Sequence, residues 1–263
     1  MKRELPHDTE EGHTQKQPRT EKQPRFVLPP HVDYQLLSVM YPDLTQFLKP
    51  NSNTGRLNVL DFGNPDAVRA LNKAILKVYF KLDIELPANS LCPSVPNRYG
   101  YVKWIADTFA PEFGPEQMVG LDIGTGASCI YPFLGIRVMQ NCQFIGSDIN
   151  QESLQVASSN IELNKLQSRI QTYLNKSHSV KIPLDEADFP HKKISFCMCN
   201  PPFYADKEER AKLEAMKDQA PVLKTDGKDD EFYTEGGELA FLMGLVDESL
   251  VLRDRVRWYT TMV

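Results

Sequence analysis

Short apolar runs alternate with helical stretches over the second half of the chain, and this alternation limits the possible folds more than any other feature. The runs fall at residues 118–123, 142–147, 170–174, 194–199 and 253–263. Strands that alternate with helices form parallel sheets, because each helix carries the chain back to the same end of the sheet. We therefore predict an α/β fold with a doubly wound, mostly parallel sheet.

The first run ends in a glycine turn with the pattern Asp122-x-Gly124-x-Gly126, and a helix is expected from about residue 127. Glycines there let a ligand approach the backbone closely, and a helix N-terminus attracts negative groups. The third glycine of the dinucleotide pattern is absent, and no Gly-Lys-Ser/Thr follows. A nucleotide-type site and a plain strand-to-helix turn therefore both remain open.

The second run is followed by Asp148, which lies 22 positions after Gly126. An acid about 20 residues after the glycines is where a ribose diol is held in folds of this kind. Asp148 is also suited to cap the helix predicted at 150–164, and the two roles are compatible. Together, turn and acid predict a ligand that contains adenosine.

The fourth run leads into Asn200-Pro201-Pro202-Phe203. Two prolines fix the backbone direction, so the chain leaves the strand as a stiff corner. The Asn200 side-chain oxygen and the Pro201 carbonyl are then two fixed acceptors, which suit the two hydrogens of a planar amino group, while Phe203 is able to stack on the attached ring. The alternative is a strand that ends in an ordinary proline turn.

A row of cations lies on a helix that is predicted to be capped by Asn64, to begin at Pro65 and to run to about residue 80. Its members, spaced four apart, are Arg69, Lys73, Lys77 and Lys81. The chain as a whole carries a net charge of −5, and this row contains no acid. It is a candidate surface for phosphates, although such a row is more often the solvated face of an amphipathic helix.

Composition sets the remaining expectations. The five cysteines favour a reducing, intracellular location without disulfides, and no apolar run is long enough for a membrane span. We expect a disordered tail over 1–30, a helical section over 31–96, and a catalytic domain over 97–263. The charged segment 205–235 has no apolar periodicity and is expected to be a functional or disordered loop. No metal site is predicted, and the oligomeric state is left open.

Several longer strings resemble one enzyme family. They are Asn64 to Leu71 (NPDAVRAL), Gly124 to Pro132 (GTGASCIYP), Phe196 to Phe203 (FCMCNPPF) and Glu235 to Glu238 (EGGE). These strings are similar to those of the adenine-N6 RNA methyltransferases, and the wording is nearer the eukaryotic branch. The resemblance covers roughly residues 35–263. It implies a Rossmann-like class I methyltransferase, S-adenosyl-L-methionine as cofactor, structured RNA as substrate, and a nuclear rather than cytoplasmic location.

The resemblance also implies roles for individual residues. Cofactor contacts carry over to Arg98, Gly124, Ser128, Asp148 and Asn200, beside Asp122 and Gly126 of the turn. Asp148 stands where the eukaryotic enzymes have glutamate. A further contact is placed at Ser179, with Ser177 as its competitor. The target adenine is expected to leave its stack and lie against Phe203, and the four-cation row is expected to line an RNA groove.

The sequence departs from the family pattern at its C-terminal end. In the family, the strand matching residues 257–263 continues into a Gly-Lys-Lys turn and two closing strands, which the sequence lacks; we expect a C-terminally truncated domain with an open sheet edge. A protein glutamine-N5 methyltransferase uses a similar corner, usually with Tyr in place of Phe203. The third possibility is a catalytically inactive RNA-binding module.

Overall fold

The computed structural model describes residues 27–29, 31–177, 179–216 and 229–262. The tail predicted for residues 1–30 lies almost entirely outside these ranges. Five parallel strands form the central sheet in the order β5-β4-β3-β6-β7. Their bounds are Met118–Ile123 (β3), Cys142–Asp148 (β4), Ile170–Leu174 (β5), Ile194–Cys199 (β6) and Val256–Tyr259 (β7). The predicted doubly wound parallel sheet is confirmed.

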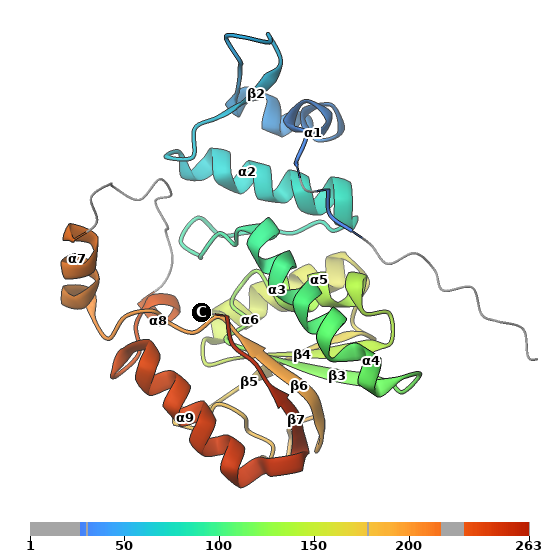
Figure 1. The fold of residues 1–263 in the computed structure, drawn as a ribbon, viewed down its shortest axis with the longest axis vertical. Helices are drawn as coiled ribbons and strands as arrows, with labels where there is room; N and C mark the ends of the chain where they lie inside the picture. The colour runs from blue at the N-terminus through green and yellow to red at the C-terminus, as the bar shows by residue number, and fades with distance from the viewer. Residues whose placement is uncertain (1–26, 30, 178, 217–228, 263) are drawn as a thin grey trace, which may run out of the picture.

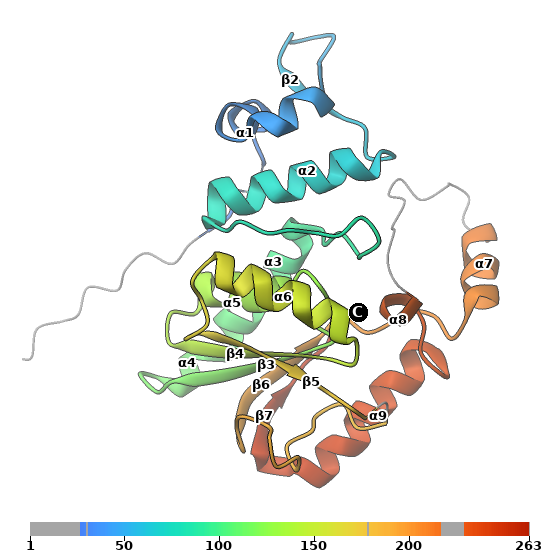
Figure 2. The same ribbon diagram turned by 180° about the vertical axis from the view of Figure 1, so that it is seen from behind.

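Helices cover both faces of this sheet (Figures 1 and 2). One face carries α3 (Val95–Thr108), α5 (Ile130–Val138) and α6 (Gln151–Leu163), and the opposite face carries α9 (Gly237–Leu252). Each face buries its own cluster of apolar side chains. Because both faces are covered, the inner strands β3 and β6 are mostly apolar, whereas the edge strands β5 and β7 carry exposed polar residues such as Gln171 and Arg257.

The N-terminal section lies beyond the layer of α3, α5 and α6, on the side away from the sheet (Figure 1). Its elements are α1 (Tyr34–Met40), η1 (Pro42–Phe47), β1 (Leu48–Pro50), β2 (Leu57–Leu60), α2 (Pro65–Ile75) and η2 (Leu76–Phe80). Asn64 caps α2 as predicted, because its side-chain oxygen accepts from the amides of Asp66 and Ala67.

Two asparagines, one in α6 and one at its C-cap, tie the N-terminal section to the sheet domain. Asn160 and Asn164 each use the side-chain oxygen to accept a backbone amide and the side-chain nitrogen to donate to the carbonyl of the same residue. The partners are Glu85 (2.7 and 2.9 Å) and Asp83 (2.9 and 2.6 Å). These paired bonds satisfy an extended backbone as a neighbouring strand does. The connection therefore fixes how the section sits on α6.

A close packing point lies between the sheet and α5. A Cβ placed on Gly135 comes within 2.2 Å of the Phe144 ring, and one placed on Gly120 comes within 2.6 Å of the same ring. Phe144 is almost fully buried, so its ring has no room to move aside. Glycine at these two positions lets the helix and the strands approach one buried aromatic side chain.

Several predicted boundaries are wrong. The helix expected from residue 127 begins at Ile130, because Cys129 adopts a left-handed backbone (φ 48°) and delays it. The last strand was expected over 253–263. It begins at Val256, after the short turn η3 (Arg253–Arg255), and ends at Tyr259. The segment expected to be a loop contains α7 (Lys207–Ala215) and α8 (Asp229–Phe232) on either side of residues outside the described ranges. α4 (Ala110–Phe113) follows α3 directly.

Candidate active site

The site lies where the order of the strands reverses. The chain runs outward from β3 through β4 to β5 and then returns to place β6 on the other side of β3. Register aligns the strand ends, since Ile123 pairs with Ser147 on one side and with Cys199 on the other. The chain therefore leaves these strands at one level, with Gly124, Asp148 and Asn200 as the next residues. Ligands of open α/β sheets bind at this kind of crevice.

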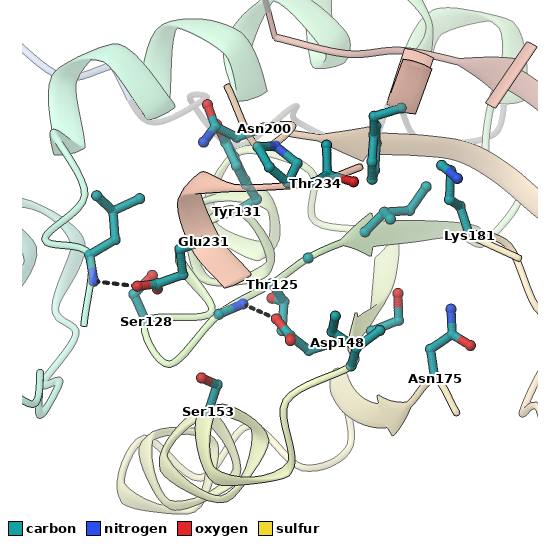
Figure 3. A pocket seen from close by; sticks show the side chains of 18 of the residues that line it. Thr125, Ser128, Tyr131, Asp148, Ser153, Asn175, Lys181, Asn200, Glu231 and Thr234 are labelled. Carbon is teal, nitrogen blue, oxygen red and sulfur yellow. Dashed lines mark hydrogen bonds between the residues drawn. The ribbon is translucent and has the colours of Figure 1, made fainter. Parts of the chain in front are cut away.

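The glycine turn after β3 is tied to the end of β4. Gly124 and Gly126 have φ values of 73° and 61°, a backbone region that strains residues with a Cβ. The amides of Gly124 and Thr125 donate to the Ser147 carbonyl at 2.9 and 3.0 Å. The Gly126 amide donates to Asp148 Oδ2 at 2.8 Å (Figure 3). The turn is therefore held open by hydrogen bonds before any ligand binds.

Asp122 lies beneath this turn and is fully buried. Its Oδ2 accepts from the Thr125 hydroxyl at 2.7 Å, while its Oδ1 is buried with no partner among the described residues. Burial away from water raises the pKa of this carboxyl to about 7, against the lowering effect of the Thr125 hydrogen bond. Asp122 supports the turn through Thr125 and is not among the residues that line the cavity described below.

One cavity of about 530 Å³ joins the predicted cofactor residues to the proline corner. Gly124, Gly126, Ser128, Asp148, Asn200 and Arg98 all line it. The volume is in the ordinary range for a small-molecule pocket. Asn200 Oδ1 is buried and lacks a hydrogen-bond partner in the described part of the chain. A buried oxygen without a donor is costly, so this atom is suited to receive a ligand hydrogen.

The proline corner presents its four residues differently. Pro202 lines the cavity, Pro201 is buried, and the Phe203 ring is 38% exposed at the surface beside it. The next residue is held in place, because the Tyr204 amide donates to the Phe232 carbonyl at 3.0 Å and the Tyr204 carbonyl accepts from the Thr234 amide at 2.9 Å. The corner is therefore fixed by the segment that contains α8.

The loop after β5 supplies a further wall. Ser177 lines the cavity and Ser179 does not, so the structure favours the competitor of the two predicted serines. Ser179 contacts Ser177 by a hydroxyl pair at 3.2 Å. Glu248 of α9 accepts from the amides of Lys181 and Ile182 at 2.7 and 2.8 Å, which fixes the end of this loop.

Sequence reasoning missed several cavity residues. Glu231 of α8 reaches over the glycine turn, Leu91 and Pro93 come from the connection before α3, and Tyr131 comes from α5. Tyr131 stands inside the GTGASCIYP string, which was a usable signal. Glu231 lies in a stretch of mixed charge without periodicity, so no local pattern marks it. Its hydrogen bond with the Leu91 amide joins residues that are 140 positions apart in the sequence.

Members of the four-cation row have partners within the protein. Arg69 donates to the carbonyls of Pro87 and Ala88 at 3.0 Å each, and so anchors a connection within the protein. Lys73 pairs with Glu85 at 3.0 Å and Lys77 pairs with Asp83 at 2.5 Å. The helix itself contains no acid between the cations, but the following segment places two acids beside them. The row is therefore partly neutralised in space.

The helices of the described residues include none that is both long and apolar enough to cross a bilayer. Among the same residues, no group of three or more histidine, cysteine or acidic side chains is arranged to hold a metal ion.

The strand order, the glycine turn and the Asn-Pro-Pro-Phe corner define a Rossmann-like class I methyltransferase fold. A family model described as RNA methyltransferase matches residues 19–263, and the chain belongs to this family. One relative is the U6 small nuclear RNA (adenine-(43)-N(6))-methyltransferase of Caenorhabditis briggsae. It is 36% identical over 248 residues, which cover 88% of this chain and 51% of the relative. The chain spans about half the length of the first curated relatives it matches.

Solved structures agree with this membership. The catalytic domain of human METTL16 in complex with a MAT2A 3′UTR hairpin aligns with a TM-score of 0.78 at 33% identity, covering 89% of this chain and 78% of that one. The N-terminal domain of human METTL16 in complex with SAH aligns with a TM-score of 0.69 at 31% identity, covering 88% and 79%. The predicted family and fold are confirmed.

Proposed function

We propose that this chain is an S-adenosyl-L-methionine-dependent methyltransferase that modifies N6 of adenosine in structured RNA. One observation carries the proposal: the Asp148 end and the Asn200 end of the site open into the same cavity. A site that transfers a methyl group to an amine must hold the donor and the amine side by side. Membership of an RNA methyltransferase family favours RNA over a protein glutamine as the substrate.

The residues present fit the cofactor. Asp148 is suited to hold a ribose diol, the open glycine turn leaves room for the thioether region, and Arg98 supplies a cation. Among the described residues, no carboxylate lies within ion-pair distance of Arg98, and its guanidinium contacts the Met262 sulfur at 3.2 Å and the Tyr131 ring at 5.8 Å. It is therefore available for a carboxylate. When bound, S-adenosylmethionine supplies the methyl group.

The chain's own residues orient the amine. Asn200 Oδ1 and the Pro201 carbonyl accept the two N6 hydrogens, which draws electron density toward nitrogen and aims its lone pair into the cavity. No strong base is needed, because the nitrogen gives up a proton only after it has become cationic. Phe203, exposed beside the cavity, stacks on the adenine once that base has left its neighbours.

RNA contacts are assigned to residues 31–96, with the methyltransferase domain over 97–263. The support is indirect: a solved METTL16 catalytic domain is named as a complex with an RNA hairpin. Lys77 and Lys81 are exposed, and we assign them to phosphates together with Lys73, while Arg69 is engaged with the carbonyls of Pro87 and Ala88. Because the relatives are named for a small nuclear RNA, we place the protein in the nucleus.

The test is a transfer assay with S-adenosylmethionine labelled on its methyl group and a hairpin RNA that carries an unpaired adenosine. We expect label in nuclease-sensitive material that yields N6-methyladenosine on digestion. The control is the same hairpin with N6,N6-dimethyladenosine at that position, which has no hydrogens for Asn200 and Pro201 to accept. Label that resists nuclease and is released by protease would instead support glutamine methylation. Binding of RNA without binding of S-adenosylhomocysteine would support an inactive RNA-binding module.

A further inference from the structure

Glu231 is an acidic side chain of the cavity wall that lies against the glycine turn. Its Oε2 accepts from the Leu91 amide at 3.0 Å (Figure 3). Its Oε1 lies 3.5 Å from the position that a Cβ on Gly126 would occupy. The carboxylate therefore connects α8 to the connection before α3 and closes the cavity above Gly126 and Ser128.

The position of Glu231 is coupled to the proline corner. Phe232, the next residue, is buried, and its carbonyl accepts from the Tyr204 amide at 3.0 Å. The Arg210 guanidinium lies 4.6 Å from the Phe232 ring centroid. Asp229 at the other end of α8 pairs with Lys207 at 2.9 Å, and because both side chains are exposed this pair adds little to the position of α8. Tyr204 directly follows the Asn200–Phe203 corner in the sequence. Its bond to Phe232 therefore holds the Glu231 carboxylate at a fixed place relative to Asn200.

The cavity is lined by charges of both signs. Arg98 and Lys181 are the cations, and Asp148, Glu231 and Glu235 are the anions. Asp148 already accepts from the amides of Gly126 and Asn150 and stands at the end of β4. It is assigned to the ribose. Lys181 lies 5.0 Å from the Phe241 ring centroid, on the side of the loop after β5. Arg98, Ser128, Glu231 and Glu235 remain for the rest of the ligand, and of the two glutamates Glu231 is the one that lies against the glycine turn, 3.5 Å from a Cβ on Gly126.

The methyl donor ends in an amino acid, whose carboxylate and ammonium carry opposite charges at neutral pH. With its ribose at Asp148 and its methyl group facing Asn200, this zwitterion is left with the remaining wall of the cavity, which includes Arg98 and Glu231. Arg98 matches the carboxylate, and none of the residues predicted from the sequence matches the ammonium. Charge-assisted hydrogen bonds of this kind are among the strongest available to a protein.

We propose that Glu231 is a cofactor-positioning residue that receives the α-ammonium group of the methyl donor, with Arg98 holding the α-carboxylate. This inference rests on the proposed function, because it takes the ligand to be S-adenosylmethionine. Glu231 thereby joins two tasks: it binds the tail of the cofactor, and through the Leu91 amide it holds α8 over the cavity. Both depend on one carboxylate that no sequence pattern marked.

Calorimetry with three ligands separates these tasks. The ligands are S-adenosylhomocysteine, its analogue without the α-amino group, and 5′-methylthioadenosine, which lacks the amino-acid tail. Glu231→Gln retains an oxygen for the Leu91 amide but removes the charge. We expect its Kd for S-adenosylhomocysteine to rise about 10- to 100-fold, the range for a hydrogen bond to a charged group, while its Kd for 5′-methylthioadenosine stays within about twofold. Asp229→Asn, the same charge change on the same helix but outside the cavity, should leave all three values unchanged.

The wild-type protein provides a second measurement that does not depend on the variant. It should bind the analogue without the amino group about 10- to 100-fold more weakly than S-adenosylhomocysteine, and this preference should disappear in Glu231→Gln. Equal affinity of the wild type for these two ligands would overturn the assignment. An equal rise in Kd for all three ligands in Glu231→Gln would also overturn the assignment. It would mean that Glu231 only holds α8 in place through the Leu91 amide. Failure of the wild type to bind S-adenosylhomocysteine would overturn the proposed function as well.

Discussion

The Gly126 amide donates a 2.8 Å hydrogen bond to the Asp148 carboxylate, so the glycine turn after β3 is fastened to the acid at the end of β4. The other oxygen of the same carboxylate accepts from the Asn150 amide at 2.9 Å. Asp148 therefore shapes the turn as well as offering its charge to a ligand. A residue with these two roles allows variants that separate them.

Asp148→Ala should remove both roles and weaken S-adenosylhomocysteine binding by about 100-fold, since a bidentate carboxylate and a preorganised turn are lost together. Asp148→Glu should recover most of the affinity, because a longer acid still reaches a diol. Titration calorimetry on both variants checks this. If the alanine variant binds within about threefold of the wild type, Asp148 does not hold the ribose.

Asp122 predicts a pH dependence of stability. Its pKa is raised to about 7 in the folded protein, chiefly by burial, from an ordinary value near 4 in the unfolded chain. Between these values the folded state binds the extra proton, so this carboxyl contributes stability at low pH that is lost as pH rises from about 4 to 7. Groups facing it are the Thr125 hydroxyl, the Asp148 carboxylate and the Arg98 guanidinium.

Asp122→Asn retains an oxygen for the Thr125 hydroxyl and does not titrate. We expect the difference in urea midpoint between variant and wild type to move in favour of the variant from pH 5 to pH 8. Denaturation followed by tryptophan fluorescence at both pH values measures it. Parallel curves for the two proteins would mean that Asp122 does not carry the proton.

Substitutions in the four-cation row, and in the acid that pairs with Lys77, should affect RNA binding and stability differently. Asp83→Asn frees Lys77 from its ion pair, so it should tighten hairpin RNA binding and steepen its salt dependence. Lys77→Ala should weaken binding and reduce the slope of log K against log salt by about 0.7 to 0.9. Arg69→Ala should lower stability more than RNA affinity, because Arg69 holds the carbonyls of Pro87 and Ala88. Fluorescence anisotropy with a labelled hairpin at about 50 to 200 mM salt measures the RNA affinity of each variant. Slopes that do not change would remove Lys77 from the RNA surface.

The sequence was informative wherever a local pattern decides the structure. The strands over 118–123, 170–174 and 194–199 have their predicted bounds. The first and the last of these are inner strands buried on both faces and are mostly apolar, whereas 170–174 is an edge strand that mixes apolar and polar residues. The Asn64 cap was also predicted from local chemistry. α7 and α8 were not, since their sequence is charged and without periodicity. The bond from Leu91 to Glu231 and the pairing of Lys77 with Asp83 depend on how distant or following segments fold back, which no local pattern encodes.

Asn200 is the position where loss should affect chemistry more than binding. Its Oδ1 is buried in the cavity wall without a hydrogen-bond donor from the described residues, so it is preorganised for a ligand hydrogen. Removing a preorganised polar group that acts on the reacting amine costs about 10²-fold or more in turnover. We expect that loss for Asn200→Ala in single-turnover methyl transfer to hairpin RNA, with a change in S-adenosylhomocysteine affinity of less than about tenfold. Turnover close to that of the wild type would show that another group orients the amine, and an equal loss in both measurements would make Asn200 a cofactor contact alone.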